Sequence, residues 1–354
     1  MIYVHVPFCR SFCTYCDFYS EIATERAAGL WADRLITEIE ARSGEITADV
    51  PTLYIGGGTP SVLPLSVLER IVAALGGGPW EEFTLEANPE DIVEKGPEYL
   101  AGLRALGVNR ISMGVQSLDD GILRWMNRRH NAERARKAFG MARMAGFGSV
   151  SVDLIFGFPL LTEKIWEDTI RETVAMHPEH ISCYQLSVES GSALGKMAAD
   201  GRFTELSPEA CRGQYDTLCR ALREAGYRHY EISNFAIPGH EAVHNSAYWR
   251  RVPYVGFGPG AHSFDGRTRR WNSSSLDWQG FESEALTEED ERVETIMLSL
   301  RTDLGINCLY LHEKSDGEAV SRLLERGDLE KTDERYRIPE DRMFVSDAII
   351  RELI

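Results

Sequence analysis

Apolar and β-branched runs recur along the first half of the chain at intervals of about 25 to 50 residues, each followed by apolar residues at helical spacing. The expected strands are Ile2–Val6, Thr52–Gly56, Phe83–Ala87, Arg110–Val115, Ser149–Leu154 and His180–Leu186. The expected helices are Glu25–Arg42, Ser66–Leu75, Pro97–Leu106, Ala132–Ala145, Glu163–Met176 and Pro208–Ala225. Successive βα units of this kind predict an α/β fold, a partial (β/α)6 TIM-like barrel.

The pattern changes from about Asp265 onward. A basic run follows at Arg267 to Arg270, and Thr287–Arg301 is predicted as a helix. The remainder, to Ile354, has the pattern of charged helices and hairpins. We therefore expect a barrel over residues 1–265 and a small C-terminal α+β module over residues 266–354.

Composition narrows the class of partner. The chain has 354 residues, 43% of them hydrophobic, and a net charge of −17, which disfavours a nucleic-acid partner because phosphate contacts need clustered Lys and Arg. No apolar run approaches the ~20 residues needed to span a bilayer, and no secretory leader precedes Ile2. Seven cysteines at irregular spacing fit a reducing compartment. We expect a cytoplasmic protein that does not span a membrane.

Three cysteines, Cys9, Cys13 and Cys16, lie in one short polar loop directly after the first predicted strand. Three thiolates can hold three corners of a four-iron cluster and leave the fourth iron open to a ligand, whereas a closed zinc site normally has four ligands. A zinc site completed by His5, or simple packing of the thiols, is the structural alternative. The three cysteines are therefore predicted to bind a [4Fe-4S] cluster.

Unusual residues also follow the later strands, at the barrel end where parallel barrels place their chemistry. Gly56, Gly57, Gly58 and Thr59 follow the second strand, Glu86 ends the third, Gln116 follows the fourth and Asp153 ends the fifth. Glycines let backbone approach a ligand closely, although any sharp turn can use them. A carboxylate on an apolar strand needs a partner, which is either a ligand or an internal Arg such as Arg110 or Arg128. Gln116 could instead serve a turn.

The C-x3-C-x2-C spacing resembles the signature of the radical S-adenosylmethionine superfamily, in which the open iron chelates S-adenosylmethionine. A wider set of motifs resembles the oxygen-independent coproporphyrinogen III oxidase family over residues 1 to about 265. These motifs are Tyr3–Cys9, Tyr54–Ser61, Glu86–Pro89, Arg110–Ser117, Asn127–Arg128 and Asp153–Gly157. The resemblance implies a barrel of the radical S-adenosylmethionine type.

Within that family the chain is most similar to the heme-chaperone branch called HemW. The decarboxylating enzyme has a further cysteine two residues beyond the third cluster ligand, where this chain has Phe18, and an arm before the first strand, which here begins at residue 2. The segment His244-Asn-Ser-Ala-Tyr248-Trp249 matches the His-Asn-x-x-Tyr-Trp motif of that branch. An imidazole beside two aromatic rings is a reasonable heme contact. The alternative is a loop histidine held by a backbone carbonyl, with Tyr248 and Trp249 in the core.

The resemblance also assigns roles to single residues. Tyr3, Gly57 and Glu86 are expected to contact S-adenosylmethionine, with Tyr15 behind it, and Gly57, Gly58 and Thr59 match the turn that binds its amino group. Gln116, Arg128, Asp153 and Ser187 match positions that line a second cofactor site in the decarboxylating relative. Arg128 could instead face a heme propionate.

The predicted function is a heme chaperone that binds heme, a [4Fe-4S] cluster and S-adenosylmethionine and transfers heme to an acceptor protein, with a reductant such as flavodoxin or ferredoxin. One alternative is an enzyme that oxidatively decarboxylates coproporphyrinogen III, which the missing parts disfavour. A structural zinc protein with no redox role is the other.

Overall fold

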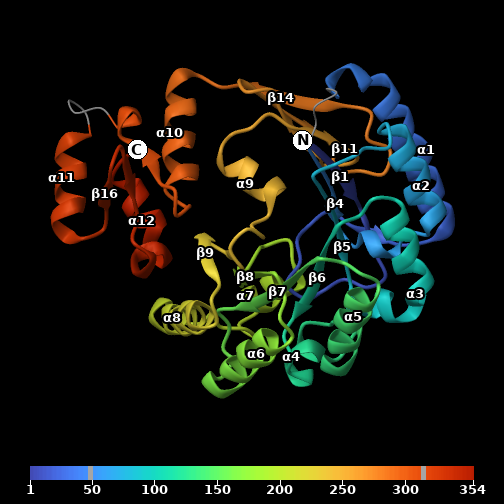
Figure 1. The fold of residues 1–354 in the computed structure, drawn as a ribbon, viewed down its shortest axis with the longest axis horizontal. Coiled ribbons are helices and arrows are strands. Elements are labelled where there is room, and N and C mark those ends of the chain that lie inside the picture. Colours follow the sequence, from blue (N-terminus) through green and yellow to red (C-terminus); the bar gives the residue numbers. More distant parts are fainter. Residues whose placement is uncertain (47–50, 312–315) are drawn as a thin grey trace.

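The computed structural model describes residues 1–46, 51–311 and 316–354 (Figure 1). Within these residues the main sheet has nine strands, in the order β11-β1-β4-β5-β6-β7-β8-β10-β9. The six central strands are β1 (Ile2–Val6), β4 (Thr52–Gly57), β5 (Glu82–Ala87), β6 (Arg110–Gln116), β7 (Ser149–Phe156) and β8 (His180–Gln185). They are parallel. All six predicted strands are confirmed, with ends that differ by no more than two residues, and so is the α/β class.

Three further strands extend the sheet beyond the prediction. β11 (Val255–Phe257) pairs in parallel with β1, which puts residues from the end of the barrel region next to its first strand. At the other edge, β10 (Asn234–Ala236) and β9 (Arg228–Glu231) pair antiparallel beside β8. These short segments lack the length of the runs that predicted the other strands.

Six long helices follow the strands and cover the outer face of the sheet (Figure 1). They are α1 (Glu25–Ala41), α2 (Leu65–Ala74), α3 (Pro89–Ala105), α5 (Ala132–Met144), α6 (Glu163–Ala175) and α8 (Pro208–Glu224). α3 begins at Pro89 rather than at the predicted Pro97, because Asn88 caps a first helical segment that kinks at Gly96. Short helices α4 (Asp120–Trp125) and α7 (Ala193–Ala199) and the 3-10 turns η1 (Ser43–Glu45) and η2 (Pro60–Val62) were not predicted.

The two faces of the sheet differ in chemistry. Leu53, Ile55 and Leu85 point toward the helices and are fully buried in the main core. The alternate positions carry polar or aromatic side chains on the concave face, namely Tyr3, His5, Thr52, Tyr54, Glu82, Thr84, Glu86, Arg110, Ser112, Ser151, Asp153, His180 and Ser182. Parallel strands covered on both faces are usually apolar throughout. This alternation therefore marks the concave face as a place for polar ligands.

A separate three-stranded sheet spans the predicted boundary at residue 265 and consists of β12 (His262–Phe264), β13 (Thr268–Asn272) and β14 (Phe281–Ala285). A second apolar core follows, built on helices and a small sheet. Its elements are α10 (Glu288–Ser299), β15 (Ile306–Asn307), η3 (Cys308–Tyr310), α11 (Gly317–Arg326), β16 (Glu330–Thr332), β17 (Arg335–Arg337), η4 (Glu340–Val345) and α12 (Ser346–Arg351). The helix predicted at Thr287–Arg301 is confirmed as α10.

The short helix α9 (Val243–Trp249) lies in the opening of the curved sheet, between the barrel and the C-terminal elements (Figure 1). In the part of the chain that the structure describes, every helix is too short or too polar to cross a bilayer.

Candidate functional site

The cysteine loop is held between two short strands at the carboxyl end of β1. β2 (Phe8–Cys9) pairs in parallel with β3 (Glu21–Ile22), which closes the loop at its base. In the middle of the loop, Thr14 N donates to Met126 O at 3.2 Å, and Thr14 O accepts from Leu194 N at 2.7 Å. The loop is therefore fixed to α4 and α7 as well as to β1.

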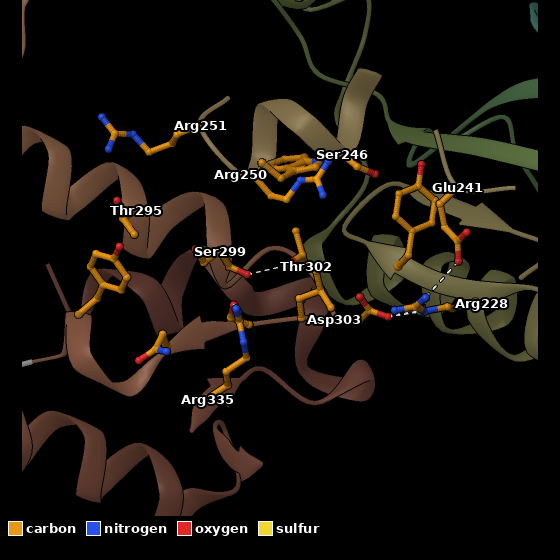
Figure 2. Close-up of a pocket in the computed structure, with 16 residues that line it drawn as sticks. Arg228, Glu241, Ser246, Arg250, Arg251, Thr295, Ser299, Thr302, Asp303 and Arg335 are labelled. Atoms are coloured by element: carbon orange, nitrogen blue, oxygen red, sulfur yellow. Dashed lines mark hydrogen bonds and ion pairs between the residues drawn. The ribbon is translucent and has the colours of Figure 1, made fainter. Parts of the chain in front are cut away.

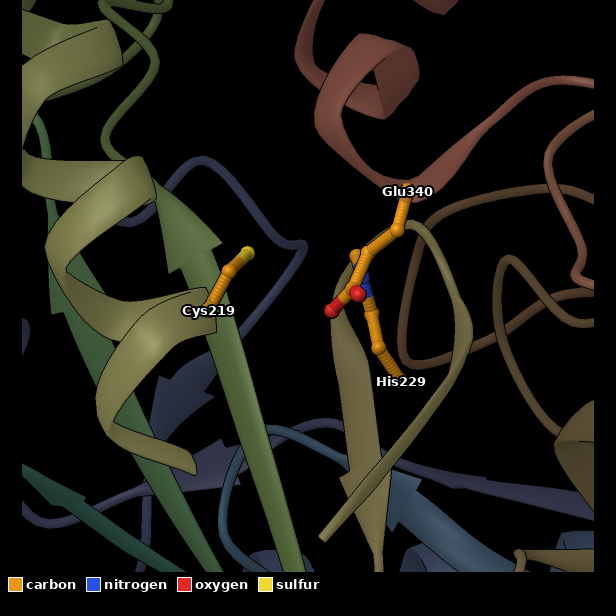
Figure 3. Close-up of side chains that lie close together, drawn as sticks. All are labelled: Cys219, His229 and Glu340. Atoms are coloured by element: carbon orange, nitrogen blue, oxygen red, sulfur yellow. The ribbon is translucent and has the colours of Figure 1, made fainter. Parts of the chain in front are cut away.

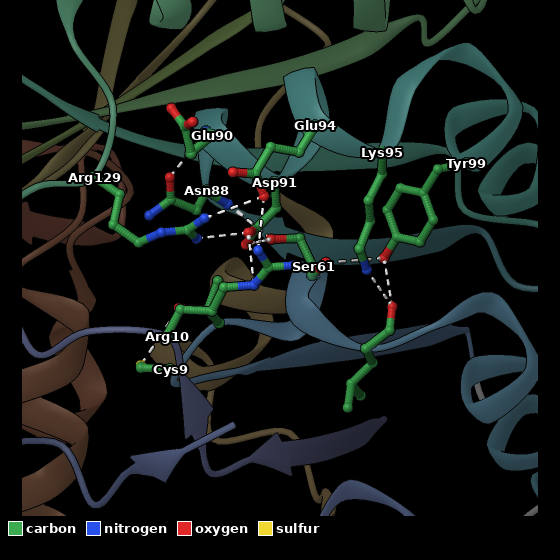
Figure 4. A network of polar contacts seen from close by, with 12 residues as sticks. Cys9, Arg10, Ser61, Asn88, Glu90, Asp91, Glu94, Lys95, Tyr99 and Arg129 are labelled. Atoms are coloured by element: carbon green, nitrogen blue, oxygen red, sulfur yellow. Dashed lines mark hydrogen bonds and ion pairs between the residues drawn. The ribbon is translucent and has the colours of Figure 1, made fainter. Parts of the chain in front are cut away.

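A buried ion network holds the start of the loop. Asp91, at the first turn of α3, is fully buried and lies 2.6 Å from Arg129 Nη1 and 3.7 Å from Arg10 Nε. Arg10 and Arg129 also pair with Glu94, at 2.7 and 3.3 Å, and Ser61 Oγ donates to Asp91 at 2.9 Å. Figure 4 shows both arginines converging on the two carboxylates. Because Arg10 follows Cys9 and Arg129 follows Arg128, the network also positions Cys9 and Arg128.

Hydrogen-bond donors face two of the three sulfur atoms. Arg128 Nη1 donates to Cys13 Sγ at 3.4 Å, and Cys9 Sγ lies 3.4 Å from Thr59 Oγ1. Burial raises the pKa of Cys16 to about 11. Cys13 and Cys9 add to this rise in pKa, and Cys16 N donates to Cys13 O at 3.4 Å, so a tight turn joins these two cysteines. Tyr15 lies in the same group, beside Cys13 and Arg128.

The glycine turn after β4 lies against the base of the loop. Thr59 N donates to Phe8 O at 2.7 Å, and a Cβ on Gly58 would meet Phe8 O at 2.7 Å. Gly57 has a φ of +111°, and a Cβ there would meet the His5 ring at 2.7 Å. Close approach of backbone to backbone thus explains Gly58, and the positive φ together with the nearby His5 ring explains Gly57.

Glu86 is the centre of a polar cluster on the concave face. Tyr54 OH donates to one carboxylate oxygen at 2.7 Å, and Gly57 N donates to the other at 3.0 Å. Burial raises the pKa of Glu86 from 4.5 to about 7. The Tyr3 ring stacks on Tyr54 with centroids 6.1 Å apart. The structure thus brings Tyr3, Gly57 and Glu86 together, and the described part of the chain offers Glu86 no cationic partner.

Of the remaining predicted cofactor residues, Gln116 ends β6, Asp153 lies on β7 and Arg128 contacts β6. Ser112 Oγ donates to both oxygens of Asp153 at 3.1 Å, and burial raises the pKa of Asp153. Arg128 donates to Gly114 O, and a Cβ on Gly114 would meet Gln116 Nε2 at 2.9 Å. Ser187 follows β8 and is exposed.

Sequence reasoning treated Arg110 only as a partner for a carboxylate and passed over His180. Arg110 is 3% exposed, and its Nε has no hydrogen-bond partner within the described residues. His180 is fully buried and bonded to Ser151 Oγ at 2.8 Å and to Tyr230 OH at 2.7 Å. The alternation of polar and apolar residues along β6 and β8 was the signal that could have placed both on the concave face.

His244 is buried on α9, and both of its ring nitrogens are engaged. Nδ1 lies 2.8 Å from Thr52 Oγ1, and Nε2 lies 2.9 Å from Tyr248 OH. Burial lowers the pKa of His244 to about 3, so the ring is neutral. The partners are side-chain hydroxyls, not the backbone carbonyl of the predicted alternative. Iron ligation would require the ring to give up one of them.

A cavity of about 600 Å³ lies between α9 and the C-terminal elements (Figure 2). Its apolar wall includes Trp249, Tyr230 and Leu304. Arg250 and Arg335 also line it, and within the described residues the Arg250 guanidinium has no hydrogen bond or ion pair. Of the three predicted heme contacts, only Trp249 lines this cavity.

The residues at the loop suit an iron–sulfur cluster. Three thiols in one loop, with donors to two of them, offer soft sulfur ligands that a cluster would bind as thiolates, and hydrogen bonds to sulfur are a known means of tuning such clusters. The cluster of Tyr3, Gly57 and Glu86 next to them offers a carboxylate and close backbone, which suits an ammonium group.

Comparisons with known proteins agree with this geometry. The radical SAM superfamily matches residues 3–173. The heme chaperone HemW of Mycobacterium tuberculosis is 33% identical over all of this chain and 94% of its own. That of Synechocystis is 36% identical over 91% of this chain and 82% of its own. The mouse mitochondrial radical S-adenosyl methionine domain-containing protein 1 is 34% identical over 86% of this chain and 74% of its own.

Among solved structures, coproporphyrinogen III oxidase (HemN) from Escherichia coli, a radical SAM enzyme, superposes with a TM-score of 0.83 at 22% identity, over 99% of this chain and 89% of that one. This likeness establishes the fold, which is that of the predicted partial barrel. The sequence identity to the HemW proteins extends over most of both chains, so this chain belongs to the HemW family within the radical SAM superfamily.

Proposed function

We propose that this chain is a heme chaperone that carries a [4Fe-4S] cluster and S-adenosylmethionine and passes heme to an acceptor protein. The observation that carries the proposal is the identity of 30 to 36% to several proteins named heme chaperone HemW, over most of the chain. The motif on α9 and the cavity beside it give heme a place to bind.

Cys9, Cys13 and Cys16 would hold the cluster, with Thr59 and Arg128 donating hydrogen bonds to its sulfur ligands. A reduced cluster of this type supplies the electron that cleaves S-adenosylmethionine. The protein's own contribution is to fix the loop through the Asp91 network and to exclude water.

S-adenosylmethionine would bind against Tyr3, Gly57, Gly58, Thr59 and Glu86, with Tyr15 behind it. The Glu86 carboxylate would accept a hydrogen bond from the ammonium group of S-adenosylmethionine. That group would supply the positive charge that the described part of the chain does not place beside Glu86. We propose that the adjoining part of the cofactor site is lined by Gln116, Arg128, Asp153 and Ser187.

Heme would bind in the cavity beside α9. The flat face of Trp249 suits a porphyrin edge, and Arg250 and Arg335 suit its propionates because guanidinium groups bind carboxylates in a fork geometry. His244 and Tyr248 do not line this cavity, so their proposed contact with heme requires their side chains to rearrange. In the present arrangement their mutual hydrogen bond would have to open before His244 could ligate iron.

The wider setting is also a proposal. We propose a cytoplasmic protein with a barrel over residues 1–265 and a C-terminal module over residues 266–354, which receives electrons from a flavodoxin or ferredoxin. The acidic net charge of −17 suits protein contacts more than binding to nucleic acid.

Anaerobic reconstitution followed by heme titration tests the proposal. We expect about four irons and four sulfides per chain, and heme binding by the wild type. Trp249→Ala should weaken heme binding by about tenfold through lost ring contact, whereas Trp80→Ala, at a ring that packs on Phe83, should not. If the wild-type protein binds no heme, the proposal that it is a heme chaperone is refuted.

The same preparation tests the enzyme alternative. Incubation with reductant, S-adenosylmethionine and coproporphyrinogen III should give no protoporphyrinogen, and robust formation of it would favour a decarboxylase. An unchanged heme spectrum in His244→Ala would remove His244 as the iron ligand without affecting the proposal itself.

A further inference from the structure

A second group of metal-ligating side chains lies far from the cysteine loop. Cys219 on α8, His229 on β9 and Glu340 at the start of η4 bring a sulfur, a ring nitrogen and a carboxylate oxygen within 4.8 Å of one another. Figure 3 shows Cys219 pointing toward the other two side chains from its helix, while Glu340 approaches from the C-terminal elements. The group is assembled by the fold from three distant parts of the sequence.

The hydrogen bonds of His229 leave one ring nitrogen free to face the other two side chains. Its Nε2 lies 3.2 Å from Tyr215 OH and 3.5 Å from Ile232 O, so a proton on this nitrogen has acceptors. The side chain is 4% exposed, and Nδ1 has no hydrogen-bond partner among the described residues and lies 3.7 Å from Glu340 Oε1. The ring is held flat against Phe235, with centroids 4.2 Å apart. Metal-bound histidines usually donate their second N–H in this way, which leaves the first nitrogen free for the ion.

The other two donors are also held in place. Cys219 is buried on the inner side of α8, and Glu340 accepts from Arg223 Nη1 at 2.9 Å. Thiolate, imidazole and carboxylate are the three protein ligands of zinc, at about 2.0 to 2.3 Å from the ion. In a tetrahedral site with those bond lengths, the ligand atoms lie roughly 3 to 4 Å from one another. The three donor atoms here lie within 4.8 Å of one another, so small side-chain movements would complete the zinc site.

We propose that Cys219, His229 and Glu340 bind one divalent ion of the zinc type, with its fourth position open to water. The ion would join α8 and β9 of the barrel to η4 of the C-terminal part. Side chains alternate along a strand, so Arg228 and Tyr230, the neighbours of His229, face the other way and line the cavity beside α9. The metal would therefore brace one wall of that cavity.

Cobalt(II) and zinc titrations test the site in the full-length chain. The background is the triple variant Cys9→Ser, Cys13→Ser, Cys16→Ser, in which the loop cannot compete for metal. We expect one cobalt per chain, a thiolate-to-cobalt charge-transfer band, tetrahedral ligand-field bands, and displacement by zinc. The reconstituted wild type should show a metal-dependent rise in its unfolding temperature.

Substitutions identify the ligands. Cys219→Ser should abolish the charge-transfer band and weaken zinc binding by at least about a hundredfold, and Glu340→Gln should weaken it by about tenfold or more. Cys211→Ser, a buried cysteine on the same helix, is the matched control and should change neither. Absence of stoichiometric binding in the triple variant, or equal binding in Cys219→Ser, would overturn the site. Circular dichroism of each variant separates loss of ligand from loss of fold.

Discussion

Removing the charge of Glu86 should stabilise the protein while weakening its cofactor binding. The Glu86→Gln side chain can still accept from Tyr54 OH, now 2.7 Å from Oε1, but its amide would face Gly57 N, which is a donor like itself. The described part of the chain places no cation beside this carboxylate, so its charge is better suited to binding a ligand than to stabilising the fold.

The magnitude follows from the pKa. Burial raises the pKa of Glu86 from 4.5 to about 7, so the folded state binds this proton more tightly than the unfolded state. The resulting stability is full below pH 4.5 and is lost as pH rises through about 7. Above that pH the ionised carboxylate costs the fold up to about 3 kcal/mol. Loss of the bond from Gly57 costs about 1 kcal/mol. At pH 8 we expect Glu86→Gln to raise the unfolding free energy by up to about 2 kcal/mol.

Urea unfolding of the cluster-free protein between pH 5 and 8 measures the change in stability. Anaerobic calorimetry with the reconstituted protein measures the change in affinity for S-adenosylmethionine. S-adenosylmethionine should bind to Glu86→Gln at least about tenfold more weakly, because the ammonium loses a charged partner. The matched control is Glu82→Gln on the same strand. Glu82 accepts from Val243 N at 2.8 Å and from His244 N at 3.0 Å, so its loss should destabilise by about 1 to 3 kcal/mol. A less stable Glu86→Gln at pH 8, or an unchanged pH slope, would refute the reasoning.

Three further substitutions test the loop and the turn. Asp91→Asn removes the fully buried carboxylate that pairs with Arg129, so it should lower the unfolding free energy by about 3 kcal/mol. The reconstituted variant should also retain less iron. An unchanged urea midpoint would contradict the role of the network. Gly57→Ala should destabilise the fold and abolish S-adenosylmethionine binding, because φ is +111° and the new Cβ would meet the His5 ring at 2.7 Å. The control Gly76→Ala, at φ +89° with open space around it, should destabilise the fold without affecting S-adenosylmethionine binding. Arg128→Lys should lower the reduction potential of the proposed cluster in an anaerobic titration, because it weakens the hydrogen bond that Arg128 donates to Cys13, a proposed cluster ligand. An equal potential would show that this bond does not tune the cluster.

The local parts of the fold could be predicted because their causes are local. Long apolar runs gave the six central strands, and helix starts carry caps that the sequence displays, such as Thr24, Asn131 and Ser207. The cysteine loop, the glycine turn and Glu86 were predictable for the same reason, since each lies directly after a strand. Parallel strands bring their carboxyl ends to one edge of the sheet.

Non-local pairings could not be predicted. β11 is three residues long and owes its strand conformation to pairing with β1, far away in the sequence. The first turn of α3 was missed because Gly96 and Pro97 interrupt the helical spacing. The partners of His244 come from β4 and α9 together, so no single stretch of sequence reveals that both ring nitrogens are engaged.

The concave face also links the two ends of the barrel. His244 contacts Thr52, the first residue of β4, whereas Gly57 is the last, a separation of about 16 Å at roughly 3.3 Å per residue. Heme beside α9 and S-adenosylmethionine at the carboxyl ends of the strands would therefore bind at opposite ends of β4, without direct contact. Between them, the His244 ring lies 5.2 Å from the Tyr54 ring, and Tyr54 OH donates to Glu86 at 2.7 Å. A ligand that draws the Glu86 carboxylate away must change the position or bonding of Tyr54, against which the His244 ring packs. We therefore expect cofactor binding to alter the heme motif through Tyr54, so that the two sites act on each other without sharing a ligand.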